Sequence, residues 1–266
     1  MAHPFLRGPG PLVIGHRGCA GECPENTLAS FARGLADGAD ILESDVHLTR
    51  DDVPVLIHDD DLARCTEDRR RVRDLDLATL QALDAGHHFA PERGTPERGK
   101  GHRIPTLEEV LAAFPGARLN LELKEDQPAI VERTLDVVEA AGRAEDLLLT
   151  AEQDPLMARI RECVVERDLP VALGASLGEV VSFVRAAVDG GEPVRGPMAL
   201  QIPDRFGGRE LVTPALLDFV HAHGVQVHVW TVNEPAEIGR LLALGVDGVV
   251  SDYPARVATA AGRQGG

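Results

Sequence analysis

Short apolar runs alternate along this chain with longer segments that carry apolar residues at helical spacing. The apolar runs have the length of single strands, and a helix pattern follows each of them. Eight strands that each precede a helix predict a parallel sheet closed into a (β/α)8 barrel, the TIM-barrel architecture. The predicted strands lie at Leu12, Ile41, Leu119, Leu147, Val171, Ala199, Val225 and Val249.

Two of these strands separate apolar from polar side chains. In the strand at 118–124 leucines occupy one face, and the other face carries Asn120, Glu122 and Lys124. Valines occupy one face of the strand at 225–230 in the same way. In a barrel the apolar face packs under the helices and the polar face points inward near the top. A half-exposed antiparallel strand shows the same alternation, so the spacing alone leaves both arrangements open.

Residues 60–103 interrupt the regular pattern. An extra strand pattern at Val53–Ile57 precedes them, and a capping-box pattern at Thr106–Glu109 begins the next helix. The stretch between is charged and contains glycine and proline, without a strong period. We expect an insertion that lies over one face of the barrel, with Phe89 in a lid, and not a second core. Residues 1–266 are then a single domain, since one barrel routinely reaches about 250 residues.

Composition excludes several classes of partner. The chain has 27 basic and 43 acidic residues, a net charge of −16, which argues against binding to nucleic acid or to anionic membranes. No apolar run approaches the ~20 residues of a membrane span, and the first residues lack the pattern of a signal peptide, so we expect a cytoplasmic chain without stable membrane association. The four cysteines lack CxxC spacing, which makes a zinc site or a disulfide framework unfavourable.

Polar side chains follow the predicted strands at their carboxyl ends. His16 and Arg17 follow the first strand between Gly15 and Gly18, and His58 follows the strand at 53–57. Barrel enzymes place their sites at this end of the strands. The one tryptophan, Trp230, ends the seventh strand, where a large ring walls a pocket. A solvated loop with an inert histidine is the alternative for His16.

Carboxylates at the same edge suggest a cation. Glu43 and Asp45 share one face of the second strand, and side-by-side carboxylates repel unless a cation or a proton lies between them. With Glu122 they form an oxygen ligand set suited to Mg²⁺ or Ca²⁺. Two solvated edge carboxylates are the alternative. A cation with Arg17 and Lys124 would neutralise a phosphate, and two histidines can act as acid and base, so phosphodiester cleavage fits the whole set.

Ordered motifs along nearly the whole chain resemble the glycerophosphodiester phosphodiesterase family. They are His16-Arg17-Gly18, Pro24-Glu25-Asn26-Thr27, Glu43-Ser44-Asp45-Val46, Pro54-Val55 through His58-Asp59, Leu121-Glu122-Leu123-Lys124, Trp230-Thr231-Val232-Asn233 and Ser251-Asp252-Tyr253-Pro254. The sequence departs from the family at Arg64-Cys65-Thr66, where Arg-Thr-Thr is usual, and at Ala151-Glu152, where Ser-Phe is frequent.

The resemblance implies a barrel with an insertion after its second strand. It implies His16 and His58 as catalytic acid and base, Arg17 and Lys124 as phosphate contacts, and Trp230 as a substrate wall. It implies as metal ligands Glu43, Asp45 and Glu122. The implied reaction is hydrolysis to glycerol 3-phosphate and an alcohol, in which the glycerol 2-hydroxyl attacks phosphorus and water opens the resulting cyclic phosphate.

Two other functions stay open. A lysophospholipase D or sphingomyelinase-D-like enzyme would need an apolar groove, and the low aromatic content argues against such a groove. A catalytically silent binding barrel would lack one of the matched histidines or carboxylates, and none is missing. For substrate choice we predict a role for Glu152. Leu148, Thr150 and Glu152 share a strand face, so Glu152 would stand at the barrel rim and favour a cationic alcohol. A solvated loop carboxylate is the alternative.

Overall fold

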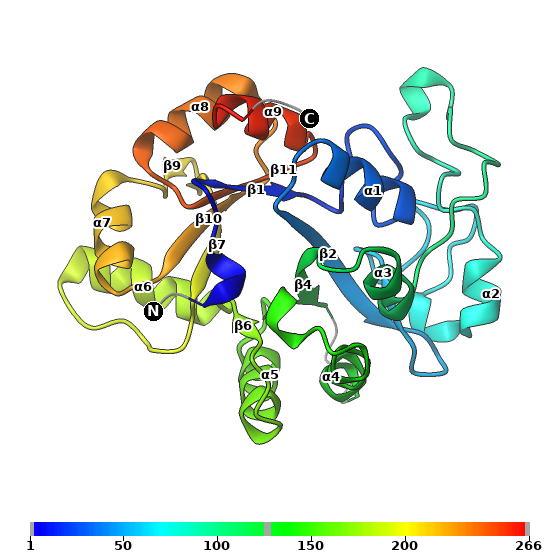
Figure 1. Ribbon diagram of the computed structural model, residues 1–266, viewed down its shortest axis with the longest axis horizontal. Helices are drawn as coiled ribbons and strands as arrows, with labels where there is room; N and C mark the ends of the chain where they lie inside the picture. Colours follow the sequence, from blue (N-terminus) through cyan, green and yellow to red (C-terminus); the bar gives the residue numbers. More distant parts are fainter. Residues whose placement is uncertain (1–2, 125–128, 264–266) are drawn as a thin grey trace.

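The computed structural model describes residues 3–124 and 129–263 and has the predicted barrel at its centre (Figure 1). In these residues eight parallel strands pair in the order β6-β5-β4-β2-β1-β11-β10-β7. A backbone hydrogen bond from Met198 N to Leu173 O, 2.8 Å long, joins the two ends of this path and nearly closes the barrel. The strands are β1 (Leu12–Gly15), β2 (Ile41–Leu48), β4 (Arg118–Leu123), β5 (Leu147–Thr150), β6 (Ala172–Leu173), β7 (Ala199–Pro203), β10 (Gln226–Trp230) and β11 (Gly248–Ser251).

Helices cover the outside of the barrel, as the repeated strand–helix pattern predicts (Figure 1). The capping box at Thr106 and Glu109 is formed as expected. The predicted helix start at Pro128 lies outside the described residues. The helices are α1 (Leu28–Ala36), α2 (Leu77–Gln81), α3 (Leu107–Ala113), α4 (Ile130–Ala141), α5 (Asp154–Glu166), α6 (Leu177–Asp189), α7 (Pro214–Ala222), α8 (Pro235–Leu244) and α9 (Pro254–Ala260).

The barrel strands divide their side chains as predicted. The leucines of β4 are buried in one apolar cluster with residues of α3, α4 and α5, and the valines of β10 are buried in a second cluster with α7 and α8. A third cluster fills the barrel interior and includes Ile14, Ile41 and Leu148. The polar residues of the same strands therefore point inward, and those near the carboxyl ends reach the mouth of the barrel.

The amino-terminal end of the barrel is plugged by a short 3-10 helix, η1 (Pro4–Leu6). Phe5 and Leu6 are buried in the interior cluster, and Arg118 Nη1 donates to the carbonyl oxygens of Phe5 and Arg7 at 2.6 Å each. Gln226 Nε2 donates to Leu6 O at 2.9 Å. The plug closes the face opposite the predicted site, so access to the interior is from the carboxyl ends of the strands.

The insertion after the second strand has a small core of its own, which differs from the expectation of a purely superficial segment. β3 (Pro54–Leu56) pairs antiparallel with β2, and η2 (Val72–Asp74), α2 and η3 (Pro91–Arg93) follow it. Irregular spacing hid the apolar residues that pack together here, because neither a period of 2 nor one of 3.6 relates them. They are Val55, Ile57, Leu62, Val72, Leu75, Leu80, Ala85 and Ile104.

No helix among the described residues combines the length and the apolar character that crossing a membrane requires. One feature that the sequence pattern did not predict is a short hairpin after β7, formed by β8 (Arg205–Phe206) and β9 (Arg209–Glu210). It stands at the same edge of the barrel as the carboxyl ends of the strands, because it continues the chain directly from β7.

Candidate functional site

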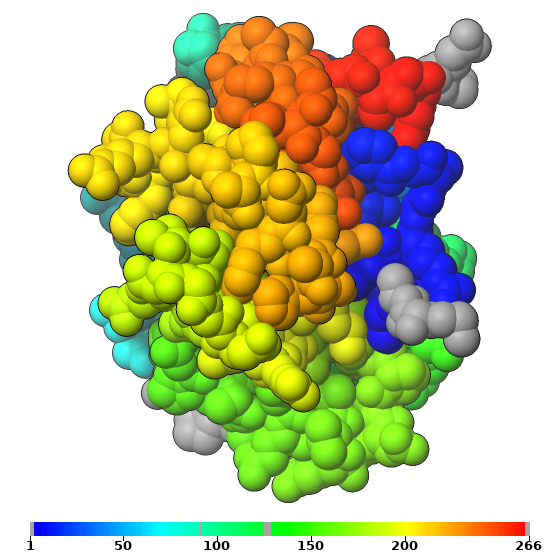
Figure 2. Space-filling view, turned by 90° about the vertical axis from the view of Figure 1, so that its left-hand side faces the viewer, coloured from blue at the N-terminus to red at the C-terminus, as the bar shows by residue number. Residues whose placement is uncertain are grey.

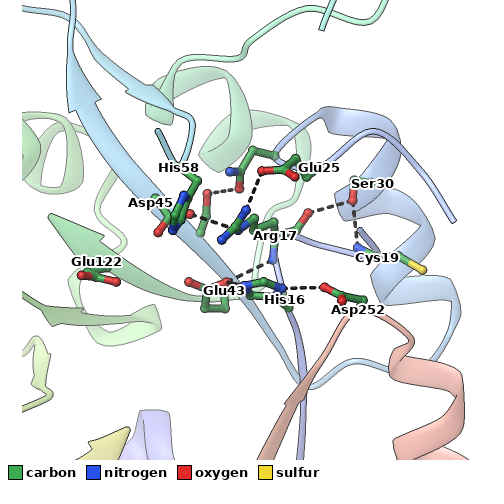
Figure 3. A network of polar contacts seen from close by, with 12 residues as sticks. His16, Arg17, Cys19, Glu25, Ser30, Glu43, Asp45, His58, Glu122 and Asp252 are labelled. Atoms are coloured by element: carbon green, nitrogen blue, oxygen red, sulfur yellow. Dashed lines mark hydrogen bonds and ion pairs between the residues drawn. The ribbon is translucent and has the colours of Figure 1, made fainter. Parts of the chain in front are cut away.

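The predicted residues of three neighbouring strands meet at the carboxyl edge of the barrel (Figure 3). β2 lies between β1 and β4 in the sheet, and Asp45 pairs in register with Glu122 of β4. His16 follows β1, and its backbone N donates to Ser251 O of β11 at 2.9 Å. The order of the strands thus places the first histidine beside the acidic residues of β2 and the last strand of the barrel.

The ring of His16 lies between two carboxylates. Its Nδ1 lies 2.6 Å from Asp252 Oδ1, and its Nε2 lies 4.0 Å from Glu43 Oε2. Asn233 Nδ2 donates to Asp252 Oδ2 at 2.6 Å and so fixes that carboxylate. Burial lowers the pKa of His16, but the hydrogen bond to Asp252 and the charge of Glu43 outweigh it and raise the pKa above the ordinary value.

His58 has a carboxylate partner of the same kind. Its Nδ1 lies 2.7 Å from Asp59 Oδ1, and Arg64 Nε donates to Asp59 Oδ2 at 2.6 Å. Burial raises the pKa of Asp59, but the hydrogen bonds from Arg64 and His58 outweigh it, so the pKa is lowered and the carboxylate stays ionised. Each histidine therefore has Nδ1 engaged, which leaves Nε2 as the nitrogen available for proton transfer.

Arg17 lies between the two histidines and is positioned by its backbone. It adopts a left-handed conformation with φ of 49°, and its backbone N donates to Glu43 Oε2 at 3.0 Å. Gly15 is required in this turn because a Cβ there would lie 2.2 Å from Gly18 O. Arg17 Nη1 donates to Glu25 at 2.7 Å, and Arg64 donates to the same carboxylate. The insertion is thereby tied to the loop after β1.

Asp45 of β2 is buried and Glu43 is half-buried, and the charge of Arg17 acts on both carboxylates. Burial and the charge of Asp45 raise the pKa of Glu43 to about 7. Burial also acts to raise the pKa of Asp45, but Lys124 and Arg17 outweigh it and lower the pKa. Lys124 Nζ lies 3.0 Å from Asp45 Oδ1 and 2.7 Å from Glu122 Oε2, so an ammonium group already bridges two of the predicted metal ligands.

These residues fit a hard divalent cation in their chemistry. Asp45 Oδ2 is buried without a hydrogen-bond partner in the described part of the chain, and Arg17 Nε lies 3.6 Å from it. A buried carboxylate oxygen without a donor is costly and is satisfied by a cation. The oxygen-only ligand set of Glu43, Asp45 and Glu122 suits Mg²⁺ or Ca²⁺.

A different group of residues is geometrically the tightest candidate for a metal among residues 3–124 and 129–263. The ligand atoms of Cys19, Glu22 and Asp37 lie within 4.8 Å of one another. However, Arg33 already pairs with both carboxylates, and burial and the charge of Asp37 raise the pKa of Cys19 to about 12. A thiol that stays protonated is a poor metal ligand, so this group is better explained as an ion-pair cluster.

Comparison with known proteins decides the family. The family model described as the glycerophosphoryl diester phosphodiesterase family matches residues 16–256. The glycerophosphodiester phosphodiesterase of Bacillus altitudinis is 30% identical, with 92% of this chain and 95% of that protein covered. The chain belongs to the glycerophosphoryl diester phosphodiesterase family. The predicted family, enzyme class and barrel fold are thus confirmed, and the family members are phosphoric diester hydrolases.

Two further relatives of the family bear on substrate. The Mus musculus protein named lysophospholipase D GDPD1 is 30% identical, over 92% of this chain and 84% of its own length. The solved structure of an Oleispira antarctica phosphodiesterase in complex with the product sn-glycerol-3-phosphate has a TM-score of 0.77 and 28% sequence identity, and the match covers 94% of this chain and 96% of that one.

The two remaining predicted site residues lie at strand ends on the same edge of the barrel and are exposed. Trp230 ends β10 and is 46% exposed at the barrel mouth. Glu152 follows β5 and is exposed, and its carbonyl oxygen accepts from Leu177 N at 2.9 Å. A cavity of about 320 Å³ lies between the loop after β1 and the insertion, and Arg64 and Phe89 are among its lining residues.

Sequence reasoning gave no role to the residues that orient the histidines. Asp252 and Asn233 are, however, in motifs that the sequence analysis quotes. Arg64 and Glu25 join the two histidine loops, yet nothing in their spacing signals the contact, because they come from a loop and an insertion 39 residues apart.

Proposed function

We propose that this chain hydrolyses glycerophosphodiesters to glycerol 3-phosphate and an alcohol with a divalent cation and histidine acid–base catalysis. The observation that carries the proposal is that His16 and His58, each held through Nδ1 by an aspartate, both lie beside the β2 carboxylates, of which Asp45 is buried (Figure 3). Histidines held in this way are suited to proton transfer through Nε2. The product bound to the Oleispira antarctica relative supports the choice of substrate.

In the proposed first step, one histidine accepts the proton of the glycerol 2-hydroxyl as its oxygen attacks phosphorus. The bond from phosphorus to the leaving alcohol breaks, and the other histidine protonates that alcohol oxygen. Water then opens the cyclic phosphate with the two histidines in exchanged roles. This leaves each ring in its starting protonation state after a complete turnover.

The positively charged residues of the site orient the phosphate. We propose that Arg17 and Lys124 contact its oxygens, since both cations lie at the edge of the carboxylate group. A divalent cation held by Glu43, Asp45 and Glu122 would offset the negative charge that builds up at phosphorus. Lys124 lies between Asp45 and Glu122, so with a cation bound there its ammonium group would contact the phosphate instead.

A second candidate is lysophospholipase D activity, which the name of the Mus musculus relative supports. It uses the same phosphodiester chemistry on a glycerophosphodiester that carries an acyl chain. The half-exposed Trp230 at the barrel mouth offers an apolar surface where such a chain could lie. We also propose that residues 1–266 act as a single domain with the insertion at 60–103.

The proposed activity is tested with a panel of substrates. The protein is incubated with Mg²⁺ or Ca²⁺ and with glycerophosphocholine, glycerophosphoglycerol or lysophosphatidylcholine, and the products are identified by phosphorus NMR. We expect glycerol 3-phosphate from the two water-soluble diesters and none in excess chelator. Phosphocholine as the product, or no turnover with either cation, would contradict the proposal.

Matched variants locate the cation. Glu43→Gln removes a predicted ligand, while Glu22→Gln alters the ion-pair cluster formed by Cys19, Glu22, Arg33 and Asp37. Calorimetric titration with Mg²⁺ or Ca²⁺ should show binding to the wild type and to Glu22→Gln and none to Glu43→Gln. The opposite pattern would place the cation in the ion-pair cluster.

A further inference from the structure

The hairpin of β8 and β9 projects an aromatic side chain into solvent. Gly207 and Gly208 join the two strands with positive φ angles of 57° and 80°, a two-residue turn that favours glycine at both positions. Phe206 is the residue before this turn and is 74% exposed. The yellow segment of the chain that contains the hairpin protrudes at the left-hand edge of Figure 2.

The base of this hairpin is firmly held, so its exposure is built into the fold. Asp204 O accepts hydrogen bonds from Leu211 N at 2.9 Å and from Val212 N at 3.3 Å, which closes the loop. Arg240 Nη2 of α8 donates to Asp204 Oδ2 at 2.6 Å and ties the loop to the barrel. The hairpin that carries Phe206 is thus anchored to the barrel at its base.

That place is the mouth of the barrel. Pro203 at the end of β7 pairs in register with Trp230 at the end of β10, and the hairpin begins directly after Pro203. Among the described residues, Phe206 and Trp230 are the aromatic side chains in the set of exposed large apolar residues. The chain has only nine Phe, Trp and Tyr residues, 7 Phe, 1 Trp and 1 Tyr. Two exposed rings at one edge of the barrel are therefore an unusual share of its aromatic side chains.

The chemistry around the rings indicates what covers them. Arg205 and Arg209 flank Phe206, and Arg205 also pairs with Glu210 at 2.9 Å. An aromatic ring beside arginines suits a phospholipid surface, where the ring enters the boundary of the acyl chains and the guanidinium groups meet phosphates. Two aromatic side chains bury only about 300–500 Å² together, far below the roughly 1,200 Å² of a stable protein interface, which disfavours a second copy of the chain.

We propose that the aromatic rim, Phe206 with Trp230, docks reversibly on aggregates of zwitterionic phospholipid. The net charge of −16 would repel an anionic surface, and it leaves a zwitterionic one as the partner. Docking would present the barrel mouth to glycerophosphodiesters that carry an acyl chain. This last consequence rests on the proposed function, whereas docking itself does not.

The single tryptophan makes docking directly measurable. The protein is titrated with vesicles of diacyl phosphatidylcholine, and the emission of Trp230 is recorded for the wild type, for Phe206→Ser and for Val188→Ser. Val188 is 79% exposed on α6 and serves as the matched control. We expect a blue shift for the wild type and the control, and a lipid concentration at half-saturation at least about tenfold higher for Phe206→Ser.

Hydrolysis of glycerophosphocholine is measured in the same samples, which are supplied with Mg²⁺ or Ca²⁺. Absence of hydrolysis with an intact blue shift refutes the proposed function and leaves docking standing. An unchanged Trp230 emission up to millimolar lipid, or equal titration curves for wild type and Phe206→Ser, overturns the docking proposal. So does a dimer in sedimentation that Phe206→Ser abolishes, because the rim would then bind a second copy. Circular dichroism of Phe206→Ser checks that its fold is intact.

Discussion

A histidine inside the barrel makes the stability of this protein depend on pH. His228 lies on the inward face of β10, is 1% exposed, and has Nε2 3.0 Å from Gln226 Oε1. Burial lowers its pKa from 6.5 to about 4, against a small opposing effect of Asp247. The folded protein therefore resists protonating this ring, while the unfolded chain protonates it below about pH 6.5.

The size of the effect follows from these two pKa values. Each pKa unit corresponds to about 1.4 kcal/mol, so the folded state loses about 3 kcal/mol in total as the pH falls from above 6.5 to below about 4. The same relation gives a loss of about 2 kcal/mol between about pH 7.5 and about pH 5. The contribution of neutral His228 to the free energy of unfolding is fully present above about pH 6.5 and is lost as the pH falls to about 4.

The assay compares the wild type with His228→Gln by urea unfolding at both pH values. The variant keeps a hydrogen-bonding side chain that does not titrate, so its free energy of unfolding should fall by about 2 kcal/mol less than that of the wild type. Other titrating groups cancel in this difference, and the same substitution at the exposed His88 is the control. Equal losses for wild type and His228→Gln would refute the reasoning.

Three further predictions concern the reaction. Glu43→Gln should abolish turnover because it loses cation binding. Full activity of the wild type in excess chelator would contradict the proposed dependence on a cation held by these carboxylates. His16→Ala and His58→Ala should each lower kcat at least ~10²-fold with unchanged circular dichroism, and near-wild-type rates in either would remove that residue from the mechanism. Glu152→Gln should lower the ratio of kcat/KM for glycerophosphocholine to that for glycerophosphoglycerol, most clearly at low salt; an unchanged ratio would leave substrate choice to the cavity beside the insertion.

The spacing of apolar residues was sufficient to predict the barrel, because its strands turn their alternating apolar side chains toward the helices. The alternating leucines of β4 and valines of β10 face the helices, and this fixed which polar residues point inward. The insertion core escaped prediction, since Leu62, Val72 and Leu80 come together without any regular spacing. The plug at Phe5 escaped for a related reason: a three-residue turn of helix is too short to show a period.

The candidate site could be predicted only in part from the chain. Strand ends placed Glu43, Asp45 and Glu122 at one edge, and the register of β2 with β4 agrees with that placement. Lys124 lies between two carboxylates, and Asp252 forms a hydrogen bond with His16. Both arrangements depend on side-chain packing between strands that are distant in sequence. Such contacts leave no pattern in a single sequence.

The central claim is that the glycerol 2-hydroxyl is the first nucleophile and that His16 and His58 move its proton. It is tested by a phosphorus NMR time course of glycerophosphocholine with the cation-supplied protein, beside the analogue that lacks the 2-hydroxyl. The account predicts a transient cyclic phosphate followed by glycerol 3-phosphate, and no reaction of the analogue. Hydrolysis of the analogue at a rate near that of glycerophosphocholine would contradict it.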